Sequence, residues 1–534
     1  MSVRLRWGAA LFAALVVSSC SKCGAPPAAK VEGVERVLPK GAVGVVIAPS
    51  LTTLGEKVKL VQSLKVTSFA GQLQGFGDGK ALFDALVGQL GIDVRDAAAL
   101  EKAGLDGARP AGAAMLISGH LYLALPVKDE AKFAATLDTL AAQRLGASLK
   151  GELVSGDAKV KTFHVKDGQP PRLAWVMSHG FALVSDGGGS TKLGALSTMG
   201  ESDSLSSDKA YADARTRVPA DGDLLAWLPL GSPALLKAPL ASAIASVSLR
   251  PAGLSVLVSG TSKPPAPNQA AFDLSALQPQ GEAKDLLGYL PRDAFLVARY
   301  TGDPSKLTPL VKDVLGPYLN KAFDEGGFDL DRQGLSQVQP GVVASLSLSE
   351  RPPMDKGMPS LDLRQTNPFT YVHLSGAAAA KSEDVVLPAL EKVITLAPRF
   401  GANMELRTRA DGQKAVVTTY AQGEGVHFAP KGPLVFFASP IQRLDALVKS
   451  DGQGGSPVTP LGDEALAVAI DLSRLSSSVR ALPESAWGLG GFAIKATTLR
   501  WLDATDDLKG ISASVGVKDQ RVEARLELKL AAAP

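Results

Sequence analysis

Residues 113–127 read AAMLISGHLYLALPV, and they predict the local fold of the chain. Two apolar runs, at residues 113–118 and 121–127, flank the pair Gly119-His120. A two-residue loop that contains glycine is a typical β-hairpin signal. The two runs are therefore expected to form neighbouring antiparallel strands.

The stretch that follows this hairpin predicts a helix. Asp129 is a suitable N-cap directly after the strand, and Phe133, Leu137 and Leu140 then follow at helical spacing. Residues 385–395 predict a similar helix in the second half of the chain.

A second hairpin is expected after this helix. Leu173, Trp175 and Met177 alternate with other residues, and Ser178-His179-Gly180 then turns the chain into the strand that begins at Phe181. Strands that follow one another in hairpins, with helices between and against them, predict an α+β fold with mainly antiparallel sheets.

The pattern of the first half recurs in the second half. Residues 38–42 read LPKGA, residues 290–294 read LPRDA, and each precedes an apolar run. Further matching pairs keep the same order along the chain: residues 91–94 and 327–330, 181–185 and 435–439, and 253–258 and 510–515. This order predicts two tandem related units.

These patterns divide the chain into five expected segments. They are two N-terminal segments at 1–19 and 20–36, an α+β unit at 37–260, a proline-rich linker at 261–285 and a second α+β unit at 286–530. Residues 261–269, TSKPPAPNQ, have the composition of a linker. Each unit is long enough to bury a core of its own.

The composition excludes some classes of protein. Apolar residues make up 46% of the 534 residues and charged residues 20%, so the chain is not disordered as a whole. The net charge is +3, and it falls to +1 if Arg4 and Arg6 leave with the signal peptide. A charge so close to neutral offers no electrostatic basis for binding nucleic acid.

The first twenty residues predict export. Arg4 and Arg6 precede a short apolar run at residues 9–17, AALFAALVV, which is too short to span a membrane. The stretch Val17-Ser18-Ser19-Cys20 resembles the lipobox of bacterial lipoproteins, with Val17 in place of the more usual leucine.

The resemblance to the lipobox implies a lipid anchor. It implies cleavage before Cys20, a diacylglycerol on the Cys20 thiol and acylation of the new amino group. Residues 1–19 are then the signal peptide and residues 20–36 a lipidated tether. The residue after Cys20 is Ser21, not the aspartate that retains such proteins at the inner membrane, so the outer membrane is the expected location. The resemblance thus implies a cell-envelope protein that is joined to the membrane by its lipid.

The chain has only two cysteines, Cys20 and Cys23. They also match C-x-x-C, but a redox or metal site would need a strand–helix context or further ligands nearby. The sequence offers neither, so the lipid anchor is the preferred interpretation. Cys23 is either a free thiol or a second attachment point.

Residues 75–80, GFGDGK, invite comparison with a phosphate-binding loop. Gln74 occupies the place of the first Walker A glycine, and Ala81 replaces the Ser or Thr that binds magnesium. The segment is therefore expected to be a break between two helices.

Residues 186–192, DGGGSTK, follow a strand and begin a helix, a position where anions can bind. The corresponding residues 439–442, SPIQ, contain no glycine. Both segments are therefore expected to serve only as helix starts, capped by Ser190 and Ser439.

No other pattern predicts catalysis, a metal or a cofactor. Two of the five histidines, His120 and His179, are expected in exposed turns, and His164 and His373 are expected on strands. None of these four, nor His427, is expected to bind a metal or to act in catalysis. Asp329-Leu330-Asp331 lacks the further oxygen ligands of a calcium loop, and Asp93 and Asp329 are expected to cap helices. The tryptophans are expected in the core: Trp175, Trp227, Trp487 and Trp501.

The body of the chain resembles exported bacterial lipoproteins of unknown function that are built from two diverged α+β repeats. The Leu-Pro-x-x-Ala openings and residues 126–133, PVKDEAKF, carry this resemblance, which implies no catalytic residues. The first hypothesis is an envelope lipoprotein without catalytic activity that acts as a scaffold or binds a partner protein. The alternatives are a carrier of an apolar or lipid ligand and, third, an envelope hydrolase.

Overall fold

The structure is a computed structural model of the 534-residue chain. It describes residues 33–155, 157–229, 240–262, 274–280, 286–348, 371–409, 411–420, 423–453, 455, 462, 464–487, 491–519 and 521–531. Cys20, Cys23 and the expected signal peptide lie outside the described residues, as does most of the segment expected as a linker.

The chain divides into two compact units. Unit 1 comprises residues 1–263 and 530–534, and unit 2 comprises residues 264–529. Both contain antiparallel strands and several helices, so the α+β fold with extensive antiparallel sheet that the hairpin pattern predicts is confirmed.

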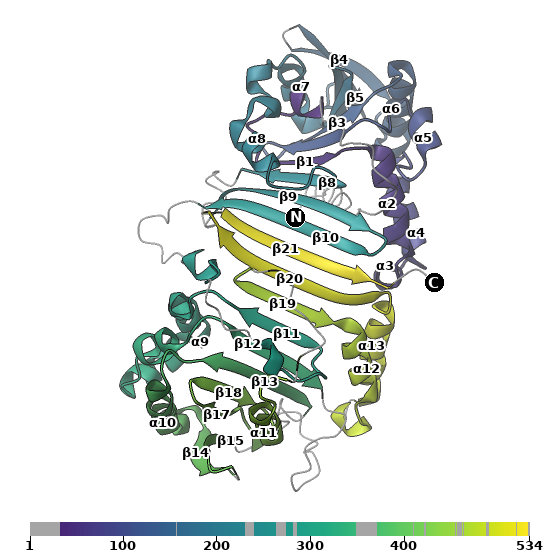
Figure 1. Ribbon diagram of the computed structural model, residues 1–534. Helices are drawn as coiled ribbons and strands as arrows, with labels where there is room; N and C mark the ends of the chain where they lie inside the picture. Colours follow the sequence, from purple (N-terminus) through teal and green to yellow (C-terminus); the bar gives the residue numbers. More distant parts are fainter. Residues whose placement is uncertain are drawn as a thin grey trace. The chain divides into compact units, whose positions relative to one another are not determined.

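The strands of unit 1 form an antiparallel sheet (Figure 1). They are β1 (Gly44–Ala48), β2 (Ala111–Met115), β3 (Leu121–Pro126), β4 (Leu149–Ser155), β5 (Ala158–His164), β6 (Leu173–Ser178), β7 (Phe181–Asp186), β8 (Leu224–Leu228), β9 (Leu240–Arg250) and β10 (Gly253–Ser262). Neighbours pair in the order β4-β5-β6-β7-β3-β2-β1-β8-β9-β10. β1 thus lies between two paired strands, and all of its residues are buried.

The turn between β6 and β7 sets the register of this part of the sheet. Ser178 pairs with Phe181 across a two-residue loop. His179 and Gly180 both have positive φ, at 50° and 77°. Positive φ at both central residues is the requirement of a type I′ turn, whose twist matches that of the strands it joins. The hairpin expected at these residues is therefore confirmed. The hairpin expected at residues 113–127 also forms, but its loop has five residues, 116–120, instead of the expected two. The first strand ends at Met115 because the backbone of Leu116 bonds within the loop, to His120 and Gly119.

The helices of unit 1 are α2 (Leu51–Ser63), α3 (Lys65–Leu73), α4 (Gly79–Leu90), α5 (Ala97–Lys102), α6 (Glu130–Leu145), α7 (Ser190–Ser197) and α8 (Lys209–Arg215). Helix α6 begins as the sequence predicts, because Asp129 accepts a hydrogen bond from the Lys132 N–H. It ends at Gly146, which adopts the left-handed conformation. The break expected at residues 75–80 is also confirmed, since it separates α3 from α4.

One buried cluster of unit 1 lies between α6 and the sheet. Helix α6 buries Phe133, Leu137 and Ala141 on one face. The Phe133 ring meets the edge of Trp175 at 5.5 Å between ring centroids, and both side chains are almost fully buried. Edge-to-face pairs of this kind add about 0.5–1.5 kcal/mol to the free energy gained by burial. Phe133 and Trp175 therefore connect the helix to β6.

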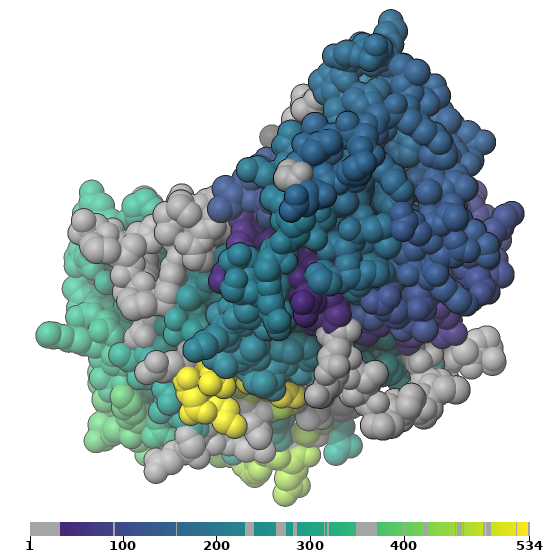
Figure 2. All heavy atoms as spheres, turned by 90° about the horizontal axis from the view of Figure 1, so that it is seen from above, coloured from purple at the N-terminus to yellow at the C-terminus, as the bar shows by residue number. Residues whose placement is uncertain are grey.

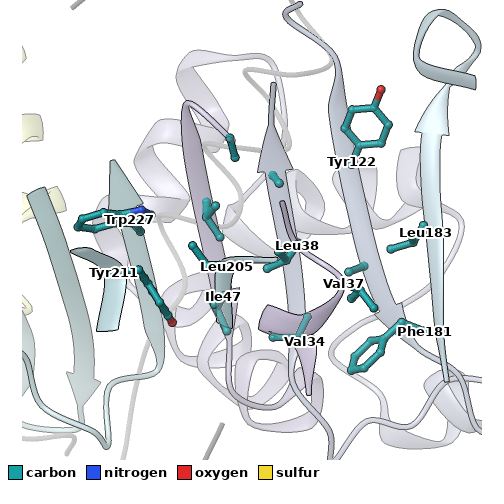
Figure 3. Packing of buried hydrophobic residues seen from close by; sticks show 14 of the residues in the cluster. Val34, Val37, Leu38, Ile47, Tyr122, Phe181, Leu183, Leu205, Tyr211 and Trp227 are labelled. Carbon is teal, nitrogen blue, oxygen red and sulfur yellow. The ribbon is translucent and has the colours of Figure 1, made fainter. Parts of the chain in front are cut away.

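Another cluster of unit 1 brings together Leu38, Tyr211 and Trp227 (Figure 3). The rings of Tyr211 and Trp227 meet edge to face at 5.9 Å. The Tyr211 hydroxyl donates to Glu35 Oε1 at 3.1 Å, and burial raises the pKa of Glu35. Figure 2 draws the heavy atoms as spheres, and residues of unit 1 are coloured mainly from purple to teal.

The strands of unit 2 are β11 (Leu296–Tyr300), β12 (Val342–Leu348), β13 (Val372–Ala379), β14 (Ala402–Thr408), β15 (Lys414–Tyr420), β16 (Gly423–Glu424), β17 (His427–Lys431), β18 (Leu434–Ala438), β19 (Leu466–Asp471), β20 (Leu508–Lys518) and β21 (Arg521–Leu530), whose last residue belongs to unit 1. Their antiparallel pairs give the order β14-β15-β17-β18-β13-β12-β11-β19-β20. Apart from the short β16, this order repeats that of unit 1, with β14 corresponding to β4 and β20 to β9.

The helices of unit 2 are α9 (Thr308–Glu325), α10 (Val386–Leu396), α11 (Ile441–Lys449), α12 (Leu472–Ala481) and α13 (Gly491–Ala504). Helix α10 confirms the helix expected at residues 385–395. Helix α11 follows β18 as α7 follows β7 in unit 1, and its buried face includes Leu444, Leu447 and Val448.

The two serines that were expected to cap helices do not do so. Asp186 Oδ1 accepts from the Gly189 N–H at 3.0 Å, whereas the Ser190 hydroxyl donates to a backbone carbonyl. At α11, Glu424 Oε2 accepts from the Ile441 N–H at 3.2 Å, whereas Ser439 makes no cap. Carboxylates thus take the place expected for the hydroxyls, and anions are favoured at a helix N-terminus.

Two further expectations are corrected. Asp93 caps no helix, since its carboxylate accepts from Arg95, while Asp96 caps α5. Trp501 on α13 is 50% exposed, so it is not a core residue, whereas Trp175, Trp227 and Trp487 are buried. Asp329 does cap the helical turn that begins at the next residue.

We expect Phe133→Ala to lower the free energy of unfolding of unit 1 by about 3–5 kcal/mol, because the truncation leaves a cavity under Trp175. Val154→Ala is the control, since Val154 is 66% exposed, and it should change this free energy by about 0.5 kcal/mol or less. Urea unfolding followed by circular dichroism measures both. Equal effects of the two substitutions would contradict the assigned core.

Candidate functional site

Unit 1 contains a cleft of about 340 Å³ at one end of β5 and β6. Ten residues line it: Glu130, Asp157, Ala158, Lys159, Lys161, Trp175, Val176, Met177, Ser197 and Thr198. They come from the start of α6, the turn before β5, the strands β5 and β6, and the end of α7. Clefts of this volume are typical of sites for small ligands or short segments of chain.

The cleft exists because the sheet forks at this point. Strand β5 pairs with β4 along its whole length, from Leu149↔His164 to Ser155↔Ala158. Strand β6 likewise pairs with β7 throughout. Between β5 and β6, however, the pairs run only from Phe163↔Leu173 to Lys161↔Trp175. Beyond that last pair the two strands separate, and the cleft lies between them. We call this feature the β5–β6 fork.

A side chain ties the separated end of β6 to a helix. The Ser178 hydroxyl donates to the Ser197 carbonyl, at the end of α7, over 2.8 Å. In unit 2, Lys431 at the end of β17 makes the corresponding bond to the Val448 carbonyl of α11, over 3.0 Å. Each bond holds the end of its strand toward a helix rather than toward the neighbouring strand.

Lys161 and Trp175 form the closed end of the cleft. The Lys161 ammonium lies 4.3 Å from the centre of the Trp175 ring and 3.2 Å from Glu130 Oε1. The side chains of Lys161 and Glu130 are about half exposed, at 49% and 54%. Exposed ion pairs contribute about 0–1 kcal/mol, so a ligand that brings its own charge can replace either partner at little cost.

The cleft is polar. Two acidic residues, Glu130 and Asp157, and two basic residues, Lys159 and Lys161, line it. The hydroxyls of Ser197 and Thr198 both donate to the Gly194 carbonyl, at 2.8 and 3.2 Å. None of the cleft-lining residues is a histidine or cysteine, so these hydroxyls have no imidazole beside them to act as a general base.

His427 is the most buried histidine that the structure describes, at 0% exposure. Its Nδ1 accepts from the Thr418 N–H at 3.0 Å, and its Nε2 lies 3.2 Å from Glu424 Oε2. Because the backbone N–H fixes Nδ1 as the acceptor, Nε2 carries the proton and donates to Glu424. Both ring nitrogens are therefore engaged in hydrogen bonds.

His373 belongs to another buried network of unit 2. Its Nδ1 accepts from Arg443 Nε at 3.0 Å, and the guanidinium of Arg443 also forms a bidentate pair with Asp293. Burial, assisted by the Arg443 charge, lowers the pKa of His373 from 6.5 to about 4. Burial acts to raise the pKa of Asp293, but the Arg443 pair outweighs it and holds that pKa below its usual value. The network is a structural connection between α11 and the sheet.

The remaining candidates from the sequence are dispersed. His179 lies in an exposed turn and His164 lies on β5, as expected. His120 lies in the loop between β2 and β3, but it is half-buried rather than exposed, and its Nδ1 is 3.3 Å from Asp186 Oδ1. Asp331 accepts from the hydroxyls of Thr308 and Ser336, so its carboxylate supports local structure. Within the described ranges, no three His, Cys, Asp or Glu side chains are grouped so as to hold a metal ion.

Sequence reasoning did not identify the cleft. It treated Trp175 as a core residue, which is correct, since Trp175 is 1% exposed. It assigned nothing to Lys159 and Lys161. Their alternation on β5 was the available signal, because it places two ammonium groups on one face of a strand.

Comparisons with known proteins do not place the chain in a family. No protein-family model matches it, and no curated protein matches it significantly. Crystal forms IV, III and I of TP0453 align with 43%, 47% and 48% of this chain and with 80%, 82% and 82% of theirs. The sequence identities are 10%, 9% and 9%, and each TM-score is 0.25, which is too low to bear on fold or function.

We expect unit 2 to lose up to about 3 kcal/mol of stability as the pH falls from 6.5 to about 4 through the titration of His373. The unfolded ring takes up a proton near 6.5 and the folded ring only near 4, so the stabilisation is complete above the first value and is lost toward the second. Urea unfolding midpoints across this interval measure the loss.

His373→Gln should remove most of that pH dependence, whereas His164→Gln, on the half-buried strand β5, should leave it unchanged. The same decline in both variants as in the wild type would show that His373 is not its source.

Proposed function

We propose that the protein is a lipid-anchored protein of the cell envelope that binds a partner and catalyses no reaction. The polar cleft at the β5–β6 fork is the observation that supports binding. Its lining combines two lysines, two carboxylates and the Trp175 ring, and it includes no histidine or cysteine.

The N-terminal sequence supports the anchor. The arginines, the short apolar run and the lipobox-like stretch that ends in Cys20 all precede the first described residue. None of the helices in the described part of the chain has the length and apolar character needed to cross a membrane. In this proposal the acyl chains on Cys20 attach the protein to the membrane, by preference the outer one, and two or more such chains anchor stably.

The repeated strand order supports an origin of the two units by tandem duplication. Unit 2 follows the strand order of unit 1, and it also repeats the fork, since β15 and β17 pair only at Val416↔Phe428. The matching sequence stretches, such as LPKGA and LPRDA, occur in the same order in both units. In this proposal the two units share a fold and differ in the residues that border their forks.

The carrier of an apolar ligand has less support. Such a carrier needs an enclosed cavity with apolar walls. Charged side chains from three elements line the cleft described here. An acyl chain bound there would remove water from Lys159, Lys161 and Glu130 and offer these charged groups no hydrogen bonds in exchange.

Cys20→Ser should abolish acylation, because the thiol is the acceptor of the diacylglycerol. Metabolic labelling of the native host with palmitate measures it, and Cys23→Ser is the matched control, which should keep the label of the mature chain. Wild-type labelling of the Cys20→Ser variant would refute the anchor.

The cleft can be tested in cells with a photo-crosslinking residue at Thr198, an exposed position of its rim. We expect a discrete adduct that Lys161→Arg retains and Lys161→Glu weakens about ten-fold, a loss of about 1.4 kcal/mol. The same probe at Lys209 on α8 is the control and should give no such adduct. An adduct that is indifferent to Lys161→Glu would contradict binding at the cleft.

A further inference from the structure

The β5–β6 fork exposes backbone groups as well as side chains. In an antiparallel pair, the N–H and C=O of successive residues point alternately to one neighbouring strand and to the other. The turn between β4 and β5 is a two-residue loop, closed by the pair Ser155↔Ala158. Closing pairs of two-residue hairpins exchange both of their hydrogen bonds. The backbone of Ala158 therefore faces β4, and that of Lys159 faces the fork.

The same argument applies to β6. Its turn into β7 is closed by the pair Ser178↔Phe181, so the backbone of Ser178 faces β7. The N–H and C=O of Met177 therefore point into the fork.

These two residues stand where the ladder would continue. The last pair between the strands is Lys161↔Trp175, and the next pair facing inward would be Lys159↔Met177. Among the described residues that pair is not formed. Lys159 and Met177 thus have two N–H donors and two C=O acceptors that the β5–β6 ladder does not use.

Unit 2 differs at this one place. The pair between β15 and β17 is Val416↔Phe428, and the next inward pair would be Lys414↔Pro430. Proline has no N–H, so the fork of unit 2 lacks the donor that Met177 supplies in unit 1. The fold accommodates proline here because this N–H is not used in the pairing of β17 with β18.

We propose that the fork of unit 1 takes up a short extended peptide segment of a partner protein, whose main chain pairs with Lys159 and Met177. This inference rests on the proposed partner-binding function and names the class of partner. A peptide main chain is the ligand that offers both donors and acceptors at strand spacing, and addition of a strand to exposed strand edges is a common mode of recognition.

The side chains around the fork define the preferred segment. Glu130 and Asp157 can pair with basic residues of the segment, and Lys159 and Lys161 with acidic residues. Glu130 lies at the start of α6 and Thr198 at the end of α7, so side chains from both helices border the cleft. A narrow, extended chain with charges of both signs fits these borders.

The test uses a phage-displayed library of short random peptides, selected on the mature protein extracted in detergent. We expect enriched peptides to bind the wild type and Lys209→Ala equally, since Lys209 is an exposed residue of α8 that does not line the cleft. Met177→Pro should bind them about ten-fold more weakly, because it removes one hydrogen bond and leaves a peptide carbonyl without its donor. Pro430 shows that the fold accepts proline in this register, and thermal unfolding of Met177→Pro checks its integrity.

A second measurement does not depend on any variant of the protein. Enriched peptides are resynthesised with single backbone N-methyl groups, and methylation at one or two positions should abolish binding to the wild type. Absence of enriched peptides, or equal binding of N-methylated and parent peptides, would overturn main-chain pairing. Peptides that respond to Lys161→Glu but not to Met177→Pro would also overturn it and leave the proposed function standing. A missing adduct at Thr198 in cells, with peptide binding intact, would count against the proposed function alone.

Discussion

The register of the β6–β7 hairpin is the constraint on which the cleft of unit 1 depends. The turn at His179 and Gly180 closes the pair Ser178↔Phe181, and this pair decides which way every residue of β6 faces. A shift by one residue would turn Trp175 away from Phe133 and turn the open backbone groups toward β7. One tight turn thus sets the aromatic packing and the chemistry of the cleft together.

Local features of the fold could be predicted from the sequence. The hairpins follow from alternation and turn residues, and α6 follows from Asp129 and the spacing of its apolar residues. The capping residues of the helices that begin near Ser190 and Ser439 could not be predicted correctly. The N–H groups there donate to Asp186, a few residues upstream, and to Glu424 on β16. The nearest serine is a poor guide where a carboxylate can reach the same N–H group.

The site itself could not be predicted, because it depends on where pairing stops. Lys161 and Trp175 are separate in sequence, and nothing in either strand marks the last pair of the ladder. The buried network of unit 2 has the same character, since Arg443 and His373 come from a helix and a strand that are distant along the chain. Single-sequence patterns report the environment of one element, whereas both features belong to several elements.

The proline in the fork of unit 2 has a consequence for association between copies of the protein. An open fork is an unpaired strand edge, and such edges allow chains to add to one another without limit. Pro430 removes one donor from one of the two forks, and the neighbouring Lys431 points its charge at the carbonyl of Val448 and at Asp451. A chain of molecules joined fork to fork would therefore have one hydrogen bond fewer at each fork of unit 2, which disfavours its growth.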